Sequence, residues 1–280
     1  MTTKSRLVIL SADGTVQKSI LETNDHIEAP NWSPDGKSLV FNKKDGLYKI
    51  AINGSIEKRI PIDNVQRMSN DHVISPDGER LFYSEKGIIY SVSIEGGQTT
   101  RLTSPDRTGL QKTCWLHGIS PDGSTLVYCA IGADWKNGEL WTIPSRGGQE
   151  RRLYKVEGHN DGPDYSPDGQ WIYFNSDLPG RAQIYRISTK DGVVERLTHD
   201  EKVNWFPHPS PDGKQVIYIT YPEGTKKHPG DLNVLIMTMS PDGKNHHLLR
   251  KLFGGQGTIN SPSWSPDSSF FAFVEYLPEN

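Results

Sequence analysis

The segment PNWSPDG at residues 30–36 ends in a four-residue motif, SPDG, that recurs along the whole chain. The other copies occupy 75–78, 120–123, 166–169, 210–213 and 240–243, and a variant, SPDS, occupies 265–268. Leaving out the copy at 240, the starting serines are 42, 45, 46, 44 and 55 residues apart. A period in the forties is typical of repeated four-stranded units, so the spacing predicts a fold built from such units.

The motif itself indicates a turn rather than a catalytic site. Proline presets φ for a type I turn, aspartate can accept a bond from nearby backbone, and glycine tolerates the positive φ that follows. The copy at 240–243 cannot start a repeat, because the units on either side of it would then have only 30 and 25 residues. Residues 232–239 and 244–252 have the composition of strands, so this copy is expected to join the third and fourth strands of a unit.

Short runs of β-branched and aromatic residues follow each repeat-starting turn and predict the second strand of each unit. They occupy 39–41, 81–83, 126–128, 171–174, 216–219 and 270–273. Residues 5–22 match a third and fourth strand, whereas 258–277 match a first and second strand. We therefore expect one all-β domain over residues 1–280, a six-bladed propeller of four-stranded antiparallel blades in which both termini share the closing blade.

Composition narrows the classes of partner. The net charge of −3 and a pI near 6.3 give no basic surface for nucleic acid. No leader peptide or membrane-spanning apolar run is recognisable. We expect a monomer without membrane or nucleic-acid partners, located in the cytoplasm, or in the periplasm if a leader has been removed. Cys114 and Cys129 are expected to be reduced, buried thiols.

The motif resembles the P-x-W-S-P-D-G repeat of TolB-type β-propellers. Residues 30–36 and 262–267 match it best, 164–169 match it closely, and the resemblance extends over essentially the whole chain. The resemblance implies a propeller, but similar propellers serve TolB proteins, peptidases and oligogalacturonate lyases. Complete TolB proteins also carry a signal peptide and an N-terminal α/β domain, and neither is expected here. The sequence contains no GxSxG motif to supply a nucleophilic serine, so a serine-peptidase activity is not expected.

Candidate binding residues come from the strand that lines the channel in each blade. The residues five positions before the starting serines are Glu28, Asn70, Trp115, Asp161, Trp205 and Asn260. The loops on the face opposite the SPDG turns vary in length, and such loops usually carry binding groups. They add the aromatic Trp135 and the basic Arg67 and Arg181, which would suit a sugar or peptide ligand and its carboxylate.

Several histidines fall in the same segments and leave three interpretations open. The polar ring could be structural, it could bind a ligand, or it could hold a divalent cation through His72, His117, Asp161 and His208. Oligogalacturonate lyases, whose repeats resemble those of this chain, use channel histidines together with a metal. The resemblance therefore implies a carbohydrate-active lyase as the alternative function. We favour a non-enzymatic binding module for a protein, peptide or small carbohydrate, without an obligatory cofactor, at the mouth opposite the SPDG turns.

Overall fold

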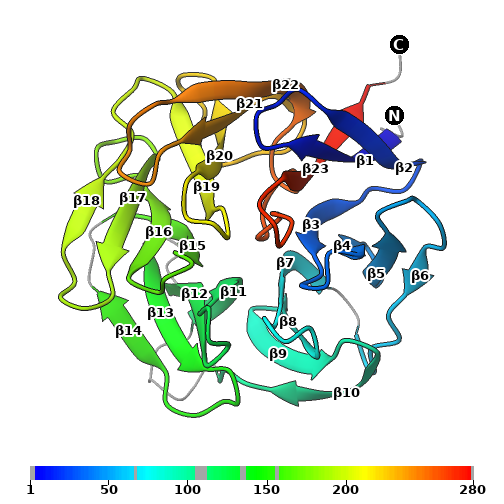
Figure 1. Ribbon diagram of the computed structural model, residues 1–280. Coiled ribbons are helices and arrows are strands. Elements are labelled where there is room, and N and C mark those ends of the chain that lie inside the picture. Colours follow the sequence, from blue (N-terminus) through cyan, green and yellow to red (C-terminus); the bar gives the residue numbers. More distant parts are fainter. Residues whose placement is uncertain (1–3, 66–67, 105–111, 133–136, 155–157, 279–280) are drawn as a thin grey trace.

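The computed structural model is a closed ring of six β-sheets around a central opening (Figure 1). It describes residues 4–65, 68–104, 112–132, 137–154 and 158–278. Five of the sheets have four strands, and each of these corresponds to one repeat of the SPDG period. All strand pairs within the blades are antiparallel, so the six-bladed fold expected from the spacing is confirmed.

The five internal blades have the following strands. Blade 1 contains β3 (Glu28–Trp32), β4 (Ser38–Lys43), β5 (Gly46–Ala51) and β6 (Lys58–Arg59). Blade 2 contains β7 (Met68–Ile74), β8 (Arg80–Glu85), β9 (Ile88–Ser93) and β10 (Gly96–Arg101). Blade 3 contains β11 (Lys112–Ile119), β12 (Thr125–Gly132), β13 (Gly138–Pro144) and β14 (Arg151–Tyr154). Blade 4 contains β15 (Asn160–Tyr165), β16 (Trp171–Ser176), β17 (Gln183–Ser188) and β18 (Val194–Arg196). Blade 5 contains β19 (Val203–Pro209), β20 (Val216–Tyr221), β21 (Leu232–Met239) and β22 (His247–Gly254).

The closing blade joins the two ends of the chain, as expected. Its strands are β1 (Lys4–Ser11), β2 (Gln17–Thr23) and β23 (Phe270–Leu277), and β1 pairs with β23 along its whole length. The innermost strand expected for this blade is irregular. Among the described residues, its ladder pairing with β23 is limited to the bridge between Trp264 and Phe271. Local side chains compete for the backbone there: Thr258 and Asn260 accept N–H bonds from Gly255 and Gly257.

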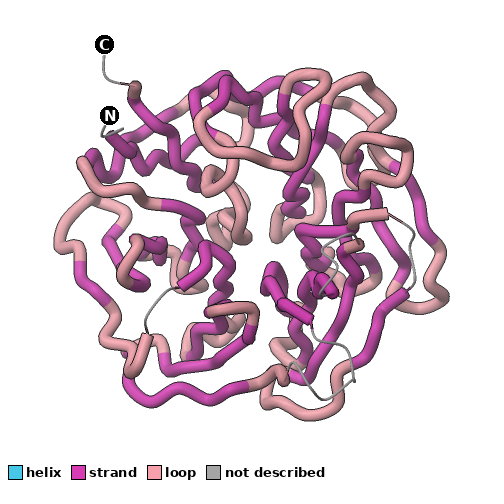
Figure 2. The backbone as a smooth tube through the Cα atoms, turned by 180° about the vertical axis from the view of Figure 1, so that it is seen from behind, coloured by secondary structure: helices cyan, strands magenta, loops and turns pink. Residues whose placement is uncertain are grey.

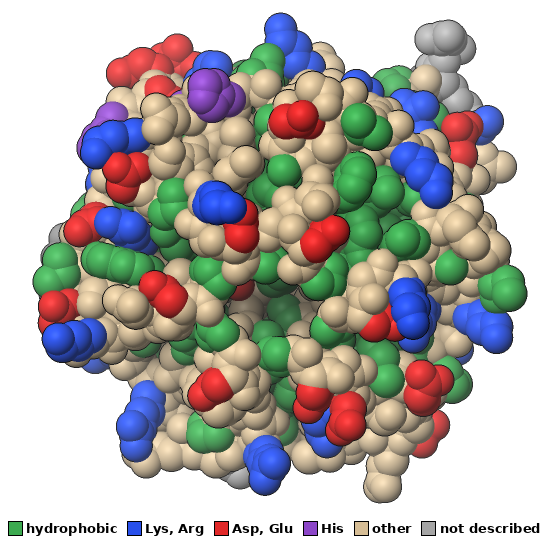
Figure 3. Space-filling model, viewed as in Figure 1, with side chains coloured by type: hydrophobic (Ala, Val, Ile, Leu, Met, Phe, Trp, Pro, Cys, Tyr) green, Lys and Arg blue, Asp and Glu red, His purple; other side chains and the backbone are tan. Residues whose placement is uncertain are grey.

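The SPDG motifs form the turns between first and second strands. In the first copy the Ser33 hydroxyl donates to Asp35, the Gly36 N–H donates to the Ser33 carbonyl, and Gly36 has a φ of 73°. The copy at 240–243 instead connects β21 to β22, which confirms its expected place between a third and a fourth strand. Seen from the two sides, the strands surround the same central opening (Figures 1 and 2), and the space-filling view shows a hollow at the centre of the ring (Figure 3).

The hydrophobic core lies between neighbouring blades rather than inside any one of them. The second strands are buried on both faces, so Phe41 of blade 1 packs in one cluster with Ile9 and Ala272 of the closing blade. Cys114 and Cys129 are buried and unpaired. No helix capable of crossing a membrane occurs in the described ranges.

The innermost strands each contain an irregularity that shapes the channel. Their pairing with the second strand shifts register after Glu28, Met68, Leu116, Asp161 and Trp205. At three of these bulges the residue four positions before the serine has a positive φ: Ala29 at 53°, Gly162 at 59° and Phe206 at 52°. A bulge re-aims side chains locally, so adjacent residues such as Trp205 and Phe206 can both face the same space.

Candidate functional site

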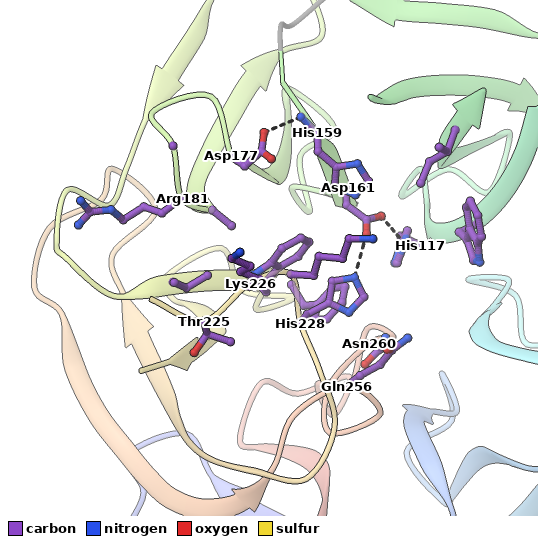
Figure 4. A pocket seen from close by; sticks show the side chains of 18 of the residues that line it. His117, His159, Asp161, Asp177, Arg181, Thr225, Lys226, His228, Gln256 and Asn260 are labelled. Atoms are coloured by element: carbon purple, nitrogen blue, oxygen red, sulfur yellow. Dashed lines mark hydrogen bonds and ion pairs between the residues drawn. The ribbon is translucent and has the colours of Figure 1, made fainter. Parts of the chain in front are cut away.

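A cavity of 750 Å³ lies at the end of the channel opposite the SPDG turns (Figure 4). Its outer rim comes from the loops at 177–182, between β16 and β17, and 223–228, between β20 and β21. Its inner walls come from β11, β15 and β19, with Gln256 and Asn260 from the segment after β22. This is the mouth with the variable loops.

The floor of the cavity, defined as its buried charged residues Asp71, His117 and Asp161, is an ionic cluster. His117 Nε2 lies 3.0 Å from Asp161 Oδ1 and 4.0 Å from Asp71 Oδ1. His228, on the rim loop, places its Nε2 3.7 Å from the other oxygen of Asp161, Oδ2. Asp161 Oδ1 also accepts the Gly162 N–H at 2.9 Å.

The charges of the floor follow from this geometry. Burial alone would lower the pKa of His117, but the charge of Asp161 overcomes it and raises that pKa to about 9. Burial would raise the pKa of Asp161, but the His117 charge holds it below its usual value. Burial raises the pKa of Asp71 to about 6 and lowers the pKa of His228. At neutral pH the floor therefore holds two carboxylates and one imidazolium, beside a neutral His228.

Aromatic rings form one wall of the cavity. The ring of His228 meets Trp205 at 4.4 Å and Phe206 at 5.1 Å, both edge to face, and Phe206 stacks on His117 at 5.9 Å. Trp205 is 2% exposed, and its indole Nε1 has no hydrogen-bond partner among the described residues. A phenylalanine at positive φ is strained, and such strain is concentrated at functional sites.

The rim is exposed and carries both signs of charge. Its charged residues are Asp177, Arg181, Glu223, Lys226 and Lys227. Asp177 accepts the backbone N–H of His159 at 2.6 Å, which fixes the start of β15. Arg181 pairs with Glu201, so its guanidinium is already engaged. Figure 4 shows the rim loops on one side of the buried Asp161 and His117.

The structure brings together five of the nine sequence-predicted ligand residues. The residues that line the cavity are Trp115, Asp161, Arg181, Trp205 and Asn260. Glu28 and Asn70 do not line it; Asn70 donates to Glu28 at 3.1 Å, which links blades 1 and 2. Arg67 and Trp135 lie outside the described residues.

The four predicted metal ligands have different surroundings. His117 and Asp161 meet in the floor, but His208 uses Nδ1 on Asp164 at 2.9 Å and Nε2 on the Ile259 carbonyl at 2.7 Å. His72 is fully buried, with Nε2 3.5 Å from the Val40 carbonyl. In the part of the chain that the structure describes, no three His, Cys, Asp or Glu side chains are placed to hold one metal ion. His208 and His72 thus contact neighbouring blades rather than a shared metal position.

Sequence reasoning missed several lining residues. Asp71 and Phe206 lie four positions before their serines, and a regular strand would turn this position away from the channel. At the bulges, these two side chains line the cavity instead. Lys226, Lys227 and His228 belong to the loop 221–231, whose unusual length was the available signal.

These features define a six-bladed β-propeller with a ligand-sized cavity at one mouth of its channel. Residues 114–273 match the family model PD40, the TolB beta propeller domain, and the chain belongs to this family.

Three proteins similar to this chain support the assignment. Protein Atu1656 of Agrobacterium fabrum, itself uncharacterized, is 40% identical over 98% of this chain and 93% of its own length. The solved structure of a TolB-like protein from Agrobacterium tumefaciens superposes with a TM-score of 0.93 at 39% identity, over the whole of both chains. The Tol-Pal system protein TolB of Francisella tularensis is 27% identical over 93% of this chain, which spans only 59% of that protein.

A more distant likeness concerns the fold alone. An oligogalacturonate lyase in complex with manganese superposes with a TM-score of 0.60 at 13% identity, over 96% of this chain and 95% of the lyase.

Proposed function

We propose that this TolB-like propeller is a binding module whose ligand, a small molecule or a short peptide segment, occupies the cavity opposite the SPDG turns. The observation that carries the proposal is the cavity itself. Its 750 Å³ falls within the range of about 300–1,000 Å³ typical of ligand pockets. It also combines aromatic walls with a few convergent polar groups, as ligand sites do.

A purely structural role accounts less well for this region. Polar groups that only stabilise the ring should satisfy one another, as His208 does with Asp164 and Ile259. The floor of the cavity differs, because the histidine nitrogens nearest to Asp161 Oδ2 and Asp71 Oδ1 are 3.7 and 4.0 Å away. Buried carboxylate oxygens with unused hydrogen-bonding capacity at a cavity fit a site that a ligand completes.

A lyase is the alternative, and the geometry favours it less. A lyase needs a neutral base and a cation free to stabilise charge near the substrate. His117 lies near two carboxylates that favour its protonated form, and Arg181 is paired with Glu201. The channel histidine and the arginine that the sequence suggested for these roles, His117 and Arg181, are therefore each paired with a carboxylate.

The test uses a variant that fills the mouth without touching the core. Thr225 lies on the rim loop and is partly buried, so Thr225→Trp should obstruct the cavity. Thr15→Trp makes the same change in the exposed turn between β1 and β2, beside the SPDG face, and serves as the control. The probe is a panel of fluorinated fragments that covers amines, carboxylates, sugars and aromatic amides, observed by ¹⁹F NMR.

The proposal expects at least one fragment class to bind the wild type and Thr15→Trp but not Thr225→Trp. Binding that persists unchanged in Thr225→Trp would contradict it, and so would a panel in which no fragment binds the wild type.

A further inference from the structure

We propose that the ligand enters the cavity with a cationic head group, a primary ammonium or a guanidinium, which lies against Asp161 and Asp71. This inference rests on the proposed function, since it names the chemical class that the same cavity takes.

The charges of the floor do not balance one another. The floor carries two carboxylates, Asp71 and Asp161, and they share one imidazolium, His117. Cys129 lies beside Asp161, but burial and that carboxylate keep the thiol neutral by raising its pKa. One negative charge is therefore left without a buried counterion. An uncompensated buried charge is costly, so a cation is the species that this floor favours.

The oxygens of the two floor carboxylates are not all hydrogen-bonded. His117 and the Gly162 N–H engage Asp161 Oδ1, and the Cys129 thiol also interacts with this carboxylate. The Oδ2 atom has His228 at 3.7 Å, which is longer than a hydrogen bond. Asp71 Oδ2 accepts from the Ser69 hydroxyl, whereas Oδ1 is 4.0 Å from His117. Each carboxylate thus keeps one oxygen with spare capacity for an N–H donor of a ligand.

Aromatic side chains surround the floor. Trp115, Trp205 and Phe206 line the same cavity as the two carboxylates. Aromatic faces attract cations, most strongly when the site is desolvated, and neutral sugars gain no such attraction.

The charges of the rim narrow the expected class of ligand further. Lys226 and Lys227 are exposed on the loop above the floor, with Glu223 on the same loop. A carboxylate at the other end of the ligand would meet these lysines, whereas a second cation would not. A free zwitterion such as an amino acid and a side chain of a peptide share the same head group, and the experiment separates them.

Calorimetric titration with four probes tests the inference. L-Arginine carries the guanidinium head group and an amino-acid zwitterion, n-butylguanidine carries the guanidinium alone, and N-acetyl-arginine amide represents a residue within a peptide. N-Acetyl-citrulline amide, which has a neutral urea in place of the guanidinium and no free ammonium, is the uncharged isostere of the capped arginine. L-Arginine or the capped arginine should bind at least about tenfold more tightly than the capped citrulline, because only the guanidinium makes charge-assisted bonds to the floor. Tighter binding of free arginine identifies a zwitterion, and tighter binding of the capped residue identifies a peptide.

Variants of the floor residues test whether the affinity for arginine depends on their charge. Asp161→Asn should weaken arginine binding by about tenfold or more, since it removes the charge and keeps the shape. Asp191→Asn, the same change in the exposed turn between β17 and β18, should leave affinity unchanged. Circular dichroism checks that Asp161→Asn is folded, and Asp71→Asn replaces it if it is not.

Capped citrulline binding as tightly as both arginine probes, no binding of any cationic probe, or Asp161→Asn and Asp71→Asn both retaining full affinity would each overturn the inference. If neutral or anionic fragments bind and Thr225→Trp blocks them, the cationic class is wrong while the binding function stands. If Thr225→Trp blocks nothing, the binding function itself fails.

Discussion

His117 and Asp161 form a buried ion pair between blades 3 and 4, with Nε2 of the histidine 3.0 Å from Oδ1 of the aspartate. Both side chains also line the cavity. The pair therefore links the stability of the ring to the charge of the proposed site, because any change in its protonation alters both.

The pair predicts that stability declines as the pH rises above neutrality. The pKa of His117 rises from 6.5 to about 9 on folding, so the folded protein holds a proton that the unfolded chain releases. The stabilisation is fully present below pH 6.5 and is lost as the pH passes through 9. The loss in the free energy of unfolding is on the order of 3 kcal/mol over this window. Urea titrations at a series of pH values measure it.

The control for this prediction is His117→Gln, which cannot titrate. Groups away from His117 contribute equally to both proteins, so the difference between the two pH profiles isolates His117 and the two carboxylates that its charge influences, Asp161 and Asp71. A variant whose stability falls with pH as steeply as the wild type would show that His117 is not the titrating group.

The bulge in blade 4 predicts a site that tolerates no side chain. Gly162 has a φ of 59°, and a Cβ there would lie 2.8 Å from Asn175 Oδ1 and 3.0 Å from a ring carbon of Phe206. Gly162→Ala should therefore cost more than the roughly 1 kcal/mol of left-handed strain alone. Gly180, at φ 91° with nothing within 4 Å of a built Cβ, is the matched control for strain without crowding. Equal losses in urea unfolding for the two variants would contradict the packing described for the bulge.

A second buried ion pair, Lys112 with Glu150, stabilises blade 3. Their side chains are 2% and 1% exposed, and Tyr128 also donates to Glu150 at 2.6 Å. Lys112→Met leaves a buried carboxylate and should cost about 3–5 kcal/mol. Adding Glu150→Leu should recover much of that loss, because it removes the unpaired charge.

The exposed pair of Lys244 with Asp242 is the comparison for that prediction, and Lys244→Met should leave thermal stability nearly unchanged. A double variant as unstable as Lys112→Met alone would argue against uncompensated charge as the cause.

The repeat spacing was sufficient to predict the blades, because each SPDG turn is a local structure whose residues determine its conformation. The closure was predictable for the same reason, since residues 5–22 and 258–277 are complementary fragments of one blade. The cavity was only partly predictable. Counting residues along a regular strand identified Trp115, Asp161 and Trp205, but it missed Asp71 and Phe206.

Those two residues depend on bulges, which arise from packing between blades and have no local signal in Asp71 or Phe206 themselves. For the histidines, the sequence grouped residues that the structure places in different surroundings. Position within the channel-lining segments placed His72, His117 and His208 in one group, whereas interblade contacts, which the sequence does not specify, give each a different partner.

A crystal structure of the protein with the tightest-binding probe tests the central claim most directly. We predict that the probe occupies the cavity between Trp205 and Asp161, with its cationic group within hydrogen-bond distance of a floor carboxylate. A probe found at the SPDG face, or in the cavity with its charge directed to solvent and a neutral part on Asp161, would contradict this account.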